Sequence, residues 1–182
     1  NTVSLKIVRQ IPLFSFSSVS DVASVSYNPS NNDVYVFLYN GTILVFSGST
    51  NEIVNRIYTN ISFYAFPLQY PSIYANNNIY ILSPNFINIT TSYTTLYVLS
   101  TYTNSIIATM KINGTASNMI YDPSDNYIYI AVPSLNEVIV LSCNTNSIIA
   151  TIPISRPGAM LYDPINGYVY VGGLGYIAVV SG

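Results

Sequence analysis

Four asparagines carry a defined chemistry, because each stands in an Asn-X-Ser/Thr sequon that can accept an N-linked glycan in a secreted protein. The four acceptors are Asn40, Asn60, Asn88 and Asn113. A chain rich in Asn and Thr also forms sequons by chance, and Asn40-Gly41 suits a two-residue hairpin turn. Glycan acceptor and ordinary loop residue are therefore both open interpretations at each position.

Two aspartates are the best candidates for an acid–base pair, since Asp122 and Asp163 each stand before a proline in the same Tyr-Asp-Pro motif. Asn28 occupies the equivalent place in Tyr27-Asn-Pro. Asn and Asp both stabilise turns by bonding the local backbone, whereas an amide cannot replace a catalytic acid. We therefore predict that Asp122, Asp163 and Asn28 are structural turn residues. A weak cation site is the alternative, although the other carboxylates are too scattered for a Ca²⁺ loop.

Composition excludes several further classes of chemistry. The chain has no His, which excludes Ser-His-Asp hydrolysis and His-ligated metals. Its single Cys, Cys143, has neither a disulfide partner nor a His base, and we interpret it as a bystander, with an intermolecular disulfide as the alternative. Five Lys and Arg against seven Asp and Glu argue against nucleic-acid binding. We expect no catalytic residue, no metal ligand and no cofactor. No apolar run approaches the ~18 residues of a membrane span.

The elements that position these residues are four similar units. They begin at Tyr27, Tyr74, Tyr121 and Tyr162, which are 47, 47 and 41 residues apart. Each start is followed by two runs of β-branched and aromatic residues, and the first three units carry a further run: Ile53-Val-Asn-Arg-Ile57, Ile106-Ile-Ala-Thr-Met110 and Ile148-Ile-Ala-Thr-Ile152. Four short strands in a period of about 40–45 residues are typical of a β-propeller blade. We predict an all-β fold of four-stranded antiparallel blades, with approximate repeats 14–60, 61–113, 114–154 and 155–182 plus 1–13 in a single domain, 1–182.

The assignment of residues 1–13 to the fourth repeat rests on their sequence. The fourth unit ends after its third run, whereas the opening Asn1-Thr-Val-Ser-Leu-Lys-Ile-Val-Arg-Gln-Ile-Pro-Leu13 is similar to Asn144-Thr-Asn-Ser-Ile-Ile-Ala-Thr-Ile-Pro-Ile154. We predict that this segment is the missing outer strand and closes a four-blade ring, which removes an exposed edge. A larger ring, built from more chain or from two chains, is the alternative.

The third and fourth units resemble the YVTN-type β-propeller repeat, which is typified by archaeal surface-layer proteins. The resemblance is carried by Asn136–Ile154, by Pro157-Gly158 with Tyr162-Asp-Pro164, and by Gly167-Tyr-Val-Tyr-Val171, where the signature strand begins. Gly172-Gly173 departs from the Thr-Asn of the signature. The resemblance implies a secreted, surface-associated protein and identifies no catalytic residues.

Antiparallel strand order places all four sequons at one end of the blades. Asn40 and Asn88 fall between second and third strands, and Asn60 and Asn113 follow fourth strands. We expect this face to be glycosylated and the opposite face to be available for partners. Paired tyrosines in the second strands, such as Tyr127/Tyr129 and Tyr168/Tyr170, are expected to pack between blades, with a sugar-binding groove as the alternative.

These observations favour a non-enzymatic extracellular module, a structural or adhesive component of an archaeal envelope, surface layer or filament. Self-association or binding to other cell-surface proteins is expected, by strand addition through residues 1–13, and glycans are a further candidate partner. One alternative is a carbohydrate- or protein-binding propeller that uses the non-glycosylated face. A lactonase-like enzyme is disfavoured, because the first-strand segments offer Ser24, Ser26, Gln69, Ser117, Asn118 and Met160 at the axis and no acid.

Overall fold

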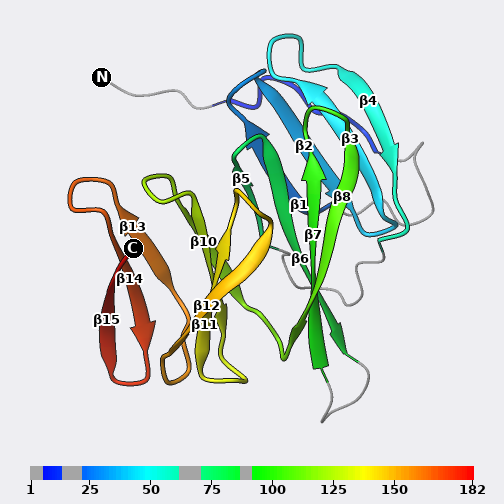
Figure 1. Cartoon of the computed structure of the whole chain (residues 1–182). Coiled ribbons are helices and arrows are strands. Elements are labelled where there is room, and N and C mark those ends of the chain that lie inside the picture. Colours follow the sequence, from blue (N-terminus) through cyan, green and yellow to red (C-terminus); the bar gives the residue numbers. More distant parts are fainter. Residues whose placement is uncertain (1–5, 14–21, 62–70, 87–91) are drawn as a thin grey trace.

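The computed structural model describes residues 6–13, 22–61, 71–86 and 92–182. These residues contain fifteen strands, β1 to β15, and no helix, and every strand pair is antiparallel. The predicted all-β class is therefore confirmed (Figure 1).

The strands form four sheets that follow one another along the chain. The first sheet contains β1 (Val22–Asn28), β2 (Asp33–Leu38), β3 (Thr42–Ser47) and β4 (Ile53–Tyr58). The second contains β5 (Ser72–Ala75), β6 (Asn78–Phe86), β7 (Ser92–Ser100) and β8 (Ser105–Asn113). The third contains β9 (Asn118–Asp122), β10 (Tyr127–Val132), β11 (Glu137–Ser142) and β12 (Ser147–Pro153). The fourth has three strands, β13 (Met160–Asp163), β14 (Tyr168–Gly173) and β15 (Tyr176–Ser181).

The turns between the first two strands of each sheet use residues that accept a left-handed backbone. Asn32, Asn77 and Asn126 have φ angles of 62°, 60° and 60°, and Gly167 has 73° at the equivalent place in the fourth sheet. Asn tolerates this conformation better than other side chains, and Gly has no steric penalty there. The asparagine-rich composition thus has a direct structural reason.

The third and outer strands pair with the same irregularity in each of the three complete sheets. The register shifts by one residue between Val45 and Phe46, between Val98 and Leu99, and between Val140 and Leu141. A β-bulge of this kind bends and twists the outer strand. Its recurrence shows that the sequence repeat is also a repeat of backbone geometry.

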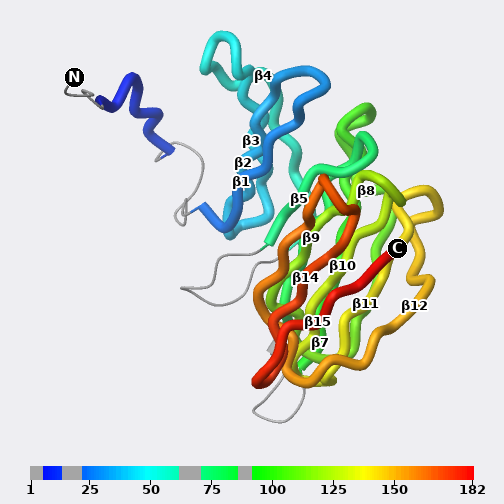
Figure 2. Tube along the Cα trace, turned by 90° about the vertical axis from the view of Figure 1, so that its left-hand side faces the viewer, coloured from blue at the N-terminus to red at the C-terminus, as the bar shows by residue number. Residues whose placement is uncertain are grey.

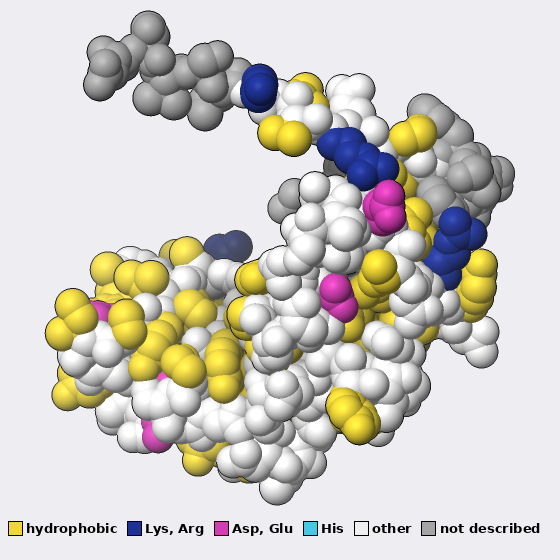
Figure 3. Space-filling model, turned by 90° about the horizontal axis from the view of Figure 1, so that it is seen from above, with side chains coloured by type: hydrophobic (Ala, Val, Ile, Leu, Met, Phe, Trp, Pro, Cys, Tyr) yellow, Lys and Arg dark blue, Asp and Glu magenta, His cyan; other side chains and the backbone are white. Residues whose placement is uncertain are grey.

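The four sheets stand side by side in an open arc. Their first strands, called inner strands here, contact one another in the order β1, β5, β9 and β13. The fourth sheet does not return to the first, and the molecule is C-shaped with a hollow between its two ends (Figure 3). The buried core lies between neighbouring sheets, so stability comes mainly from apolar burial there, at about 25 cal/mol per Å².

The predicted closure by the N-terminal strand is not found among the described residues. Residues 6–13 form no strand, and among the described residues β15 pairs only with β14. Residues 6–13 instead lie by the first sheet, where Ile11 and Leu13 pack against a cluster that includes Phe46. Figure 2 shows this segment far from β15. Because the arc is open, a segment held at one end does not reach the other. Residues 1–5 lie outside the described part of the chain.

Candidate functional site

The antiparallel order gives each sheet two ends. The pocket end carries the turns between first and second strands and between third and outer strands. The sequon end carries the turns between second and third strands and the links from an outer strand to the next sheet. Contacts between sheets keep each end on one side of the arc: Asn76 Nδ2 donates to the Cys143 carbonyl at 3.2 Å at the pocket end, and the Thr115 N–H donates to Ser134 Oγ at 3.0 Å at the sequon end.

A pocket of about 370 Å³ lies at the pocket end, between the first and second sheets. We call it the turn pocket, and its lining is entirely uncharged: Asn28, Ser30, Asn31, Asn77, Thr101 and Tyr102. Its walls come from three turns, those after β1, β5 and β7. The Tyr102 side chain is 92% exposed and leaves an aromatic face open to solvent.

Hydrogen bonds across the two sheets hold the turn pocket in shape. Ser30 Oγ and Tyr74 Oη lie 2.6 Å apart, and Tyr74 Oη donates to Asn77 Oδ1 at 3.1 Å. Thr101 Oγ1 donates to the Asn77 carbonyl at 2.8 Å. Among the described residues no partner is recorded for Asn77 Nδ2, which leaves that group available to a ligand. No sequence motif indicated this pocket, although equivalent turns of adjacent repeats must lie near one another in any such array.

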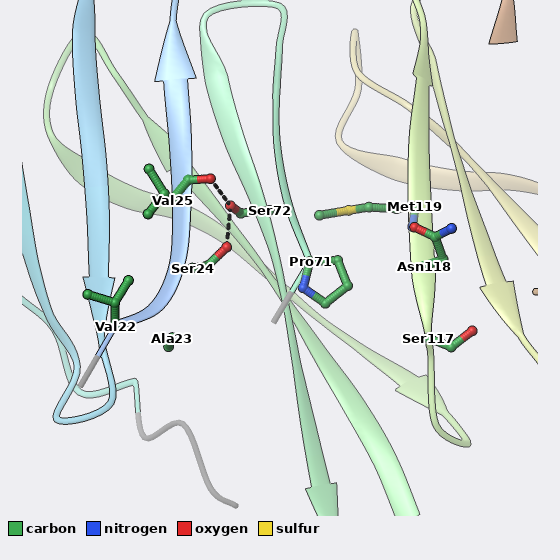
Figure 4. A pocket seen from close by; sticks show the side chains of 9 residues that line it. All are labelled: Val22, Ala23, Ser24, Val25, Pro71, Ser72, Ser117, Asn118 and Met119. Atoms are coloured by element: carbon green, nitrogen blue, oxygen red, sulfur yellow. Dashed lines mark hydrogen bonds between the residues drawn. The ribbon is translucent and has the colours of Figure 1, made fainter. Parts of the chain in front are cut away.

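A second cavity, of about 580 Å³, lies along the inner strands, and we call it the axial cavity. Its polar groups are Ser24, Ser72, Ser117 and Asn118, and Val22, Ala23, Val25, Pro71 and Met119 complete the lining (Figure 4). Ser24 Oγ and Ser72 Oγ lie 2.7 Å apart.

Of the residues expected at the axis, the structure places Ser24, Ser117 and Asn118 in the axial cavity. Ser26 is instead buried, Met160 packs in the core between the third and fourth sheets, and Gln69 lies outside the described residues. The lining contains no ionisable side chain, so the cavity offers neutral hydrogen bonding and apolar contact and no acid–base pair.

The Asp-Pro and Asn-Pro residues bond to their own turns. Asn28 Oδ1 accepts from the Ser30 N–H at 2.9 Å, and Asp163 Oδ1 accepts from the Ile165 N–H at 2.8 Å. Asp122 Oδ1 accepts from both the N–H and Oγ of Ser124, at 2.8 and 2.7 Å. Asp122 is fully buried, and its Oδ2 has no hydrogen-bond partner among the described residues. Asp122 and Asp163 belong to different sheets and form no shared site.

Three of the four sequon asparagines can be placed, and Asn40, Asn60 and Asn113 are all exposed. Asn40 belongs to the turn between β2 and β3. Asn60 follows β4 beside that turn, because Thr59 Oγ1 donates to the Gly41 carbonyl at 2.6 Å. Asn113 ends β8 opposite Tyr93 at the start of β7. All three lie at the sequon end, and Asn88 lies outside the described residues.

The single cysteine is buried and unreactive. Cys143 is 2% exposed in the core between the second and third sheets. Burial raises the pKa of its thiol to about 11, while a hydrogen bond with Tyr80 acts in the opposite direction. The thiol is therefore protonated at neutral pH and is a poor nucleophile.

The described residues contain no group of three or more Cys, Asp or Glu side chains that could hold a metal ion. Within the same part of the chain, no helix that could cross a membrane is found.

Comparison with known proteins identifies the fold and nothing finer. No family model and no curated protein matches the chain. Among solved structures, the chain is similar to Kuenenia stuttgartiensis Hydrazine Synthase, with a TM-score of 0.67 and 10% identity over 91% of this chain and 47% of that one. The computationally designed Ika4 protein matches with a TM-score of 0.61 and 12% identity over 91% and 94% of the two chains. U3-55K matches with a TM-score of 0.58 and 10% identity over 91% and 53%. The chain spans about half the length of the first and third of these.

Proposed function

We propose that this protein is a non-enzymatic extracellular module of the YVTN-type β-propeller class, a structural or adhesive part of an archaeal envelope, surface layer or filament. The observation that supports it is the placement of the sequons. Asn40 and Asn60 of the first sheet and Asn113 of the second are exposed, and all three lie at the sequon end. An acceptor must project from the folded surface to carry a glycan, and these side chains do so without disturbing the core.

Glycan mapping tests this proposal directly. The 182-residue chain is secreted from a host that N-glycosylates, and its peptides are analysed by mass spectrometry. We expect added glycan mass on the peptides of Asn40, Asn60 and Asn113. Asn→Gln variants at the three positions should lose the added glycan mass. Asn31→Gln changes an exposed asparagine outside any sequon and should keep the same glycan mass. Bare asparagines at all three positions contradict the proposal.

The cellular location is tested separately in the source cells. Gold-labelled antibodies against the chain should decorate intact cells. Labelling that requires permeabilised cells contradicts a surface role.

A second candidate function is binding of a neutral, hydroxyl-rich ligand such as a carbohydrate on the face opposite the sequons. The turn pocket supports it, because an uncharged lining of amides and hydroxyls lies beside the exposed ring of Tyr102. Sugars are bound by hydrogen bonds from such groups and by stacking on aromatic faces.

A glycan array with three proteins tests the second candidate. The unmodified chain should bind, and Tyr102→Ala should weaken the affinity by about tenfold, which corresponds to about 1.4 kcal/mol. Tyr58→Ala is the matched control, since Tyr58 is 77% exposed on the outer strand β4 and lies outside the turn pocket. Equal binding by the two variants contradicts a ligand in the turn pocket.

A further inference from the structure

Neighbouring sheets meet through one repeated interface. One face of each sheet, the donor face, is built on a tyrosine of the second strand paired with a valine of the third: Tyr35 with Val45, Tyr80 with Val98, Tyr129 with Val140 and Tyr170 with Val179. In the first three sheets this pair packs against the opposite face of the next sheet, the acceptor face. Among the described residues, no further sheet packs on the donor face of the fourth sheet.

Exposure shows how incomplete the last donor face is. Val45, Val98 and Val140 are 2%, 0% and 5% exposed, whereas Val179 at the same position is 55% exposed. Its neighbour Ile177 is 70% exposed, although the equivalent Val138 of the third sheet is fully buried. Figure 3 shows hydrophobic side chains gathered over this end of the arc.

The first sheet presents the matching acceptor face at the other end of the arc. Its Val34, Val36, Leu44 and Phe46 correspond to the residues with which the fourth sheet contacts the third, Val169, Val171, Ala178 and Val180. Within the described chain only Ile11 and Leu13, from outside the sheet, cover it. A largely apolar pocket of about 320 Å³ remains there, lined in part by Val34, Phe46 and Asn51.

Asn51 gives this pocket a specific chemistry. Asn51, Asn104 and Asn146 occupy equivalent turns before the outer strands and have φ angles of 56°, 53° and 51°. Asn104 Oδ1 accepts from Tyr35 Oη of the preceding sheet at 3.1 Å, and Asn146 Oδ1 accepts from Tyr80 Oη at 2.6 Å. No tyrosine reaches Asn51 among the described residues. Tyr170 is the equivalent tyrosine of the fourth sheet, and no sheet packs over it in the described part of the chain.

The outer edge of β15 shows the same complementarity. Each complete sheet ends in an outer strand with Ile at its first or second position and Ile or Met four residues later, and Ile7-Val-Arg-Gln-Ile11 repeats this pattern. Ile154, which follows β12, packs into the interface between the third and fourth sheets. Leu13 holds the equivalent sequence position and already packs on the first sheet. Residues 6–13 therefore lie where an outer strand would leave a preceding sheet.

Charge agrees with this arrangement. If residues 6–13 took the place that β12 has in the third sheet, Lys6 would align with Ser147 and lie opposite Ser181. The adjacent Gly182 lies against the carboxylate of Asp125. An ammonium group placed there faces an acidic neighbour.

We propose that two copies of this chain pair head to tail into one closed ring. The fourth sheet of each copy docks on the first sheet of the other, Tyr170 enters the pocket beside Asn51, and residues 6–13 add to β15 as its outer strand. The register of the third sheet places Gln10 opposite Ala178 and Ile11 opposite Ile177. Such a head-to-tail interface joins different surfaces of the two copies. When the rotation that relates the copies closes a ring, neither copy keeps an uncovered donor or acceptor face. The inference does not depend on glycosylation or on the cellular location.

Native mass measurement and cysteine cross-linking test it together. The unglycosylated full chain should have twice its 20.0 kDa mass. Ile177→Asp should convert it to monomer, while Ile107→Asp, at a 50% exposed isoleucine on β8 in the middle of the arc, should not. On a Cys143→Ser background, mixing the single variants Gln10→Cys and Ala178→Cys should give a disulfide-linked pair. Mixing Thr151→Cys with Ala178→Cys should give none, because Thr151 is already paired with Ile139 in its own sheet.

Three results would overturn the proposal. The first is a wild-type monomer at micromolar concentration. The second is a chain carrying both Gln10→Cys and Ala178→Cys that cross-links only within itself, which would mean closure by a single copy. The third is an open-ended polymer in place of a pair.

Discussion

The hydroxyl of Tyr80 in the second sheet donates to Oδ1 of Asn146 in the third sheet at 2.6 Å. Tyr80 is fully buried, and its phenol reaches the turn before the next sheet's outer strand. The bond joins the hydrophobic interface between the two sheets to a turn whose asparagine has a left-handed backbone. A single contact therefore fixes the position of the second sheet against the third and the conformation of this turn.

Removing this hydroxyl should destabilise the fold. Tyr80→Phe keeps the ring and leaves Asn146 Oδ1 without its donor, which should lower the free energy of unfolding by about 1–2 kcal/mol. Urea denaturation measures the change. Tyr102→Phe is the control, since Tyr102 is 92% exposed and its loss of a hydroxyl should cost almost nothing. Equal stability of the two variants would contradict the role of the bond.

Asp122 should tolerate an amide and not a methyl group. Asp122→Asn keeps the Oδ1 that accepts from Ser124 and replaces a buried oxygen that has no partner, as Asn28 does in the first sheet. We expect unchanged or higher stability. Asp122→Ala loses the turn bonds and should cost about 1–2 kcal/mol. Thermal unfolding of both variants measures the change in stability. A loss of several kcal/mol of unfolding free energy in Asp122→Asn would show instead that the fold requires the negative charge of Asp122.

The hairpin at Asn40-Gly41 should require glycine for two reasons. Gly41 has a φ of +83°, and a Cβ added there would clash with the backbone carbonyl of Ile61. Gly175 has a similar φ of +81° but open space around it. Gly41→Ala should therefore lose clearly more stability than Gly175→Ala, for which backbone strain of about 1 kcal/mol is expected. Gly41→Ala preserves the Asn40 sequon, so any loss seen by calorimetry is separate from glycosylation. Equal losses would show that the close approach to Ile61 carries no cost.

Alkaline pH should weaken the fold through the buried tyrosines. Burial first, and then the negative charge of Asp122, raise the pKa of Tyr129 to about 12 from its ordinary value of 10. The folded state thus holds this proton more tightly than the unfolded state, so the stabilisation is complete below pH 10 and is lost as pH rises from about 10 to 12. Unfolding free energies measured from pH 8 upward should fall more steeply for the unmodified chain than for Tyr129→Phe. The same pH dependence of the unfolding free energy in both proteins would contradict a raised pKa of Tyr129 in the folded state.

The sequence by itself determined the four units, because the strand and turn signals are local. β-branched runs, Asn and Gly at left-handed turns and the repeated tyrosine motif specify each sheet from about 40 consecutive residues. Tyr129 could likewise be assigned to an interface, since alternation in a strand decides which face a side chain occupies.

Only the tertiary structure decided where residues 6–13 lie and that the arc stays open. An outer-strand sequence can pair with any compatible free edge, so its pattern does not say which edge it joins. Curvature is the sum of the twist and packing between sheets, which no single repeat encodes. The turn pocket likewise draws Asn28 and Tyr102 from different sheets, and their proximity depends on how those sheets pack.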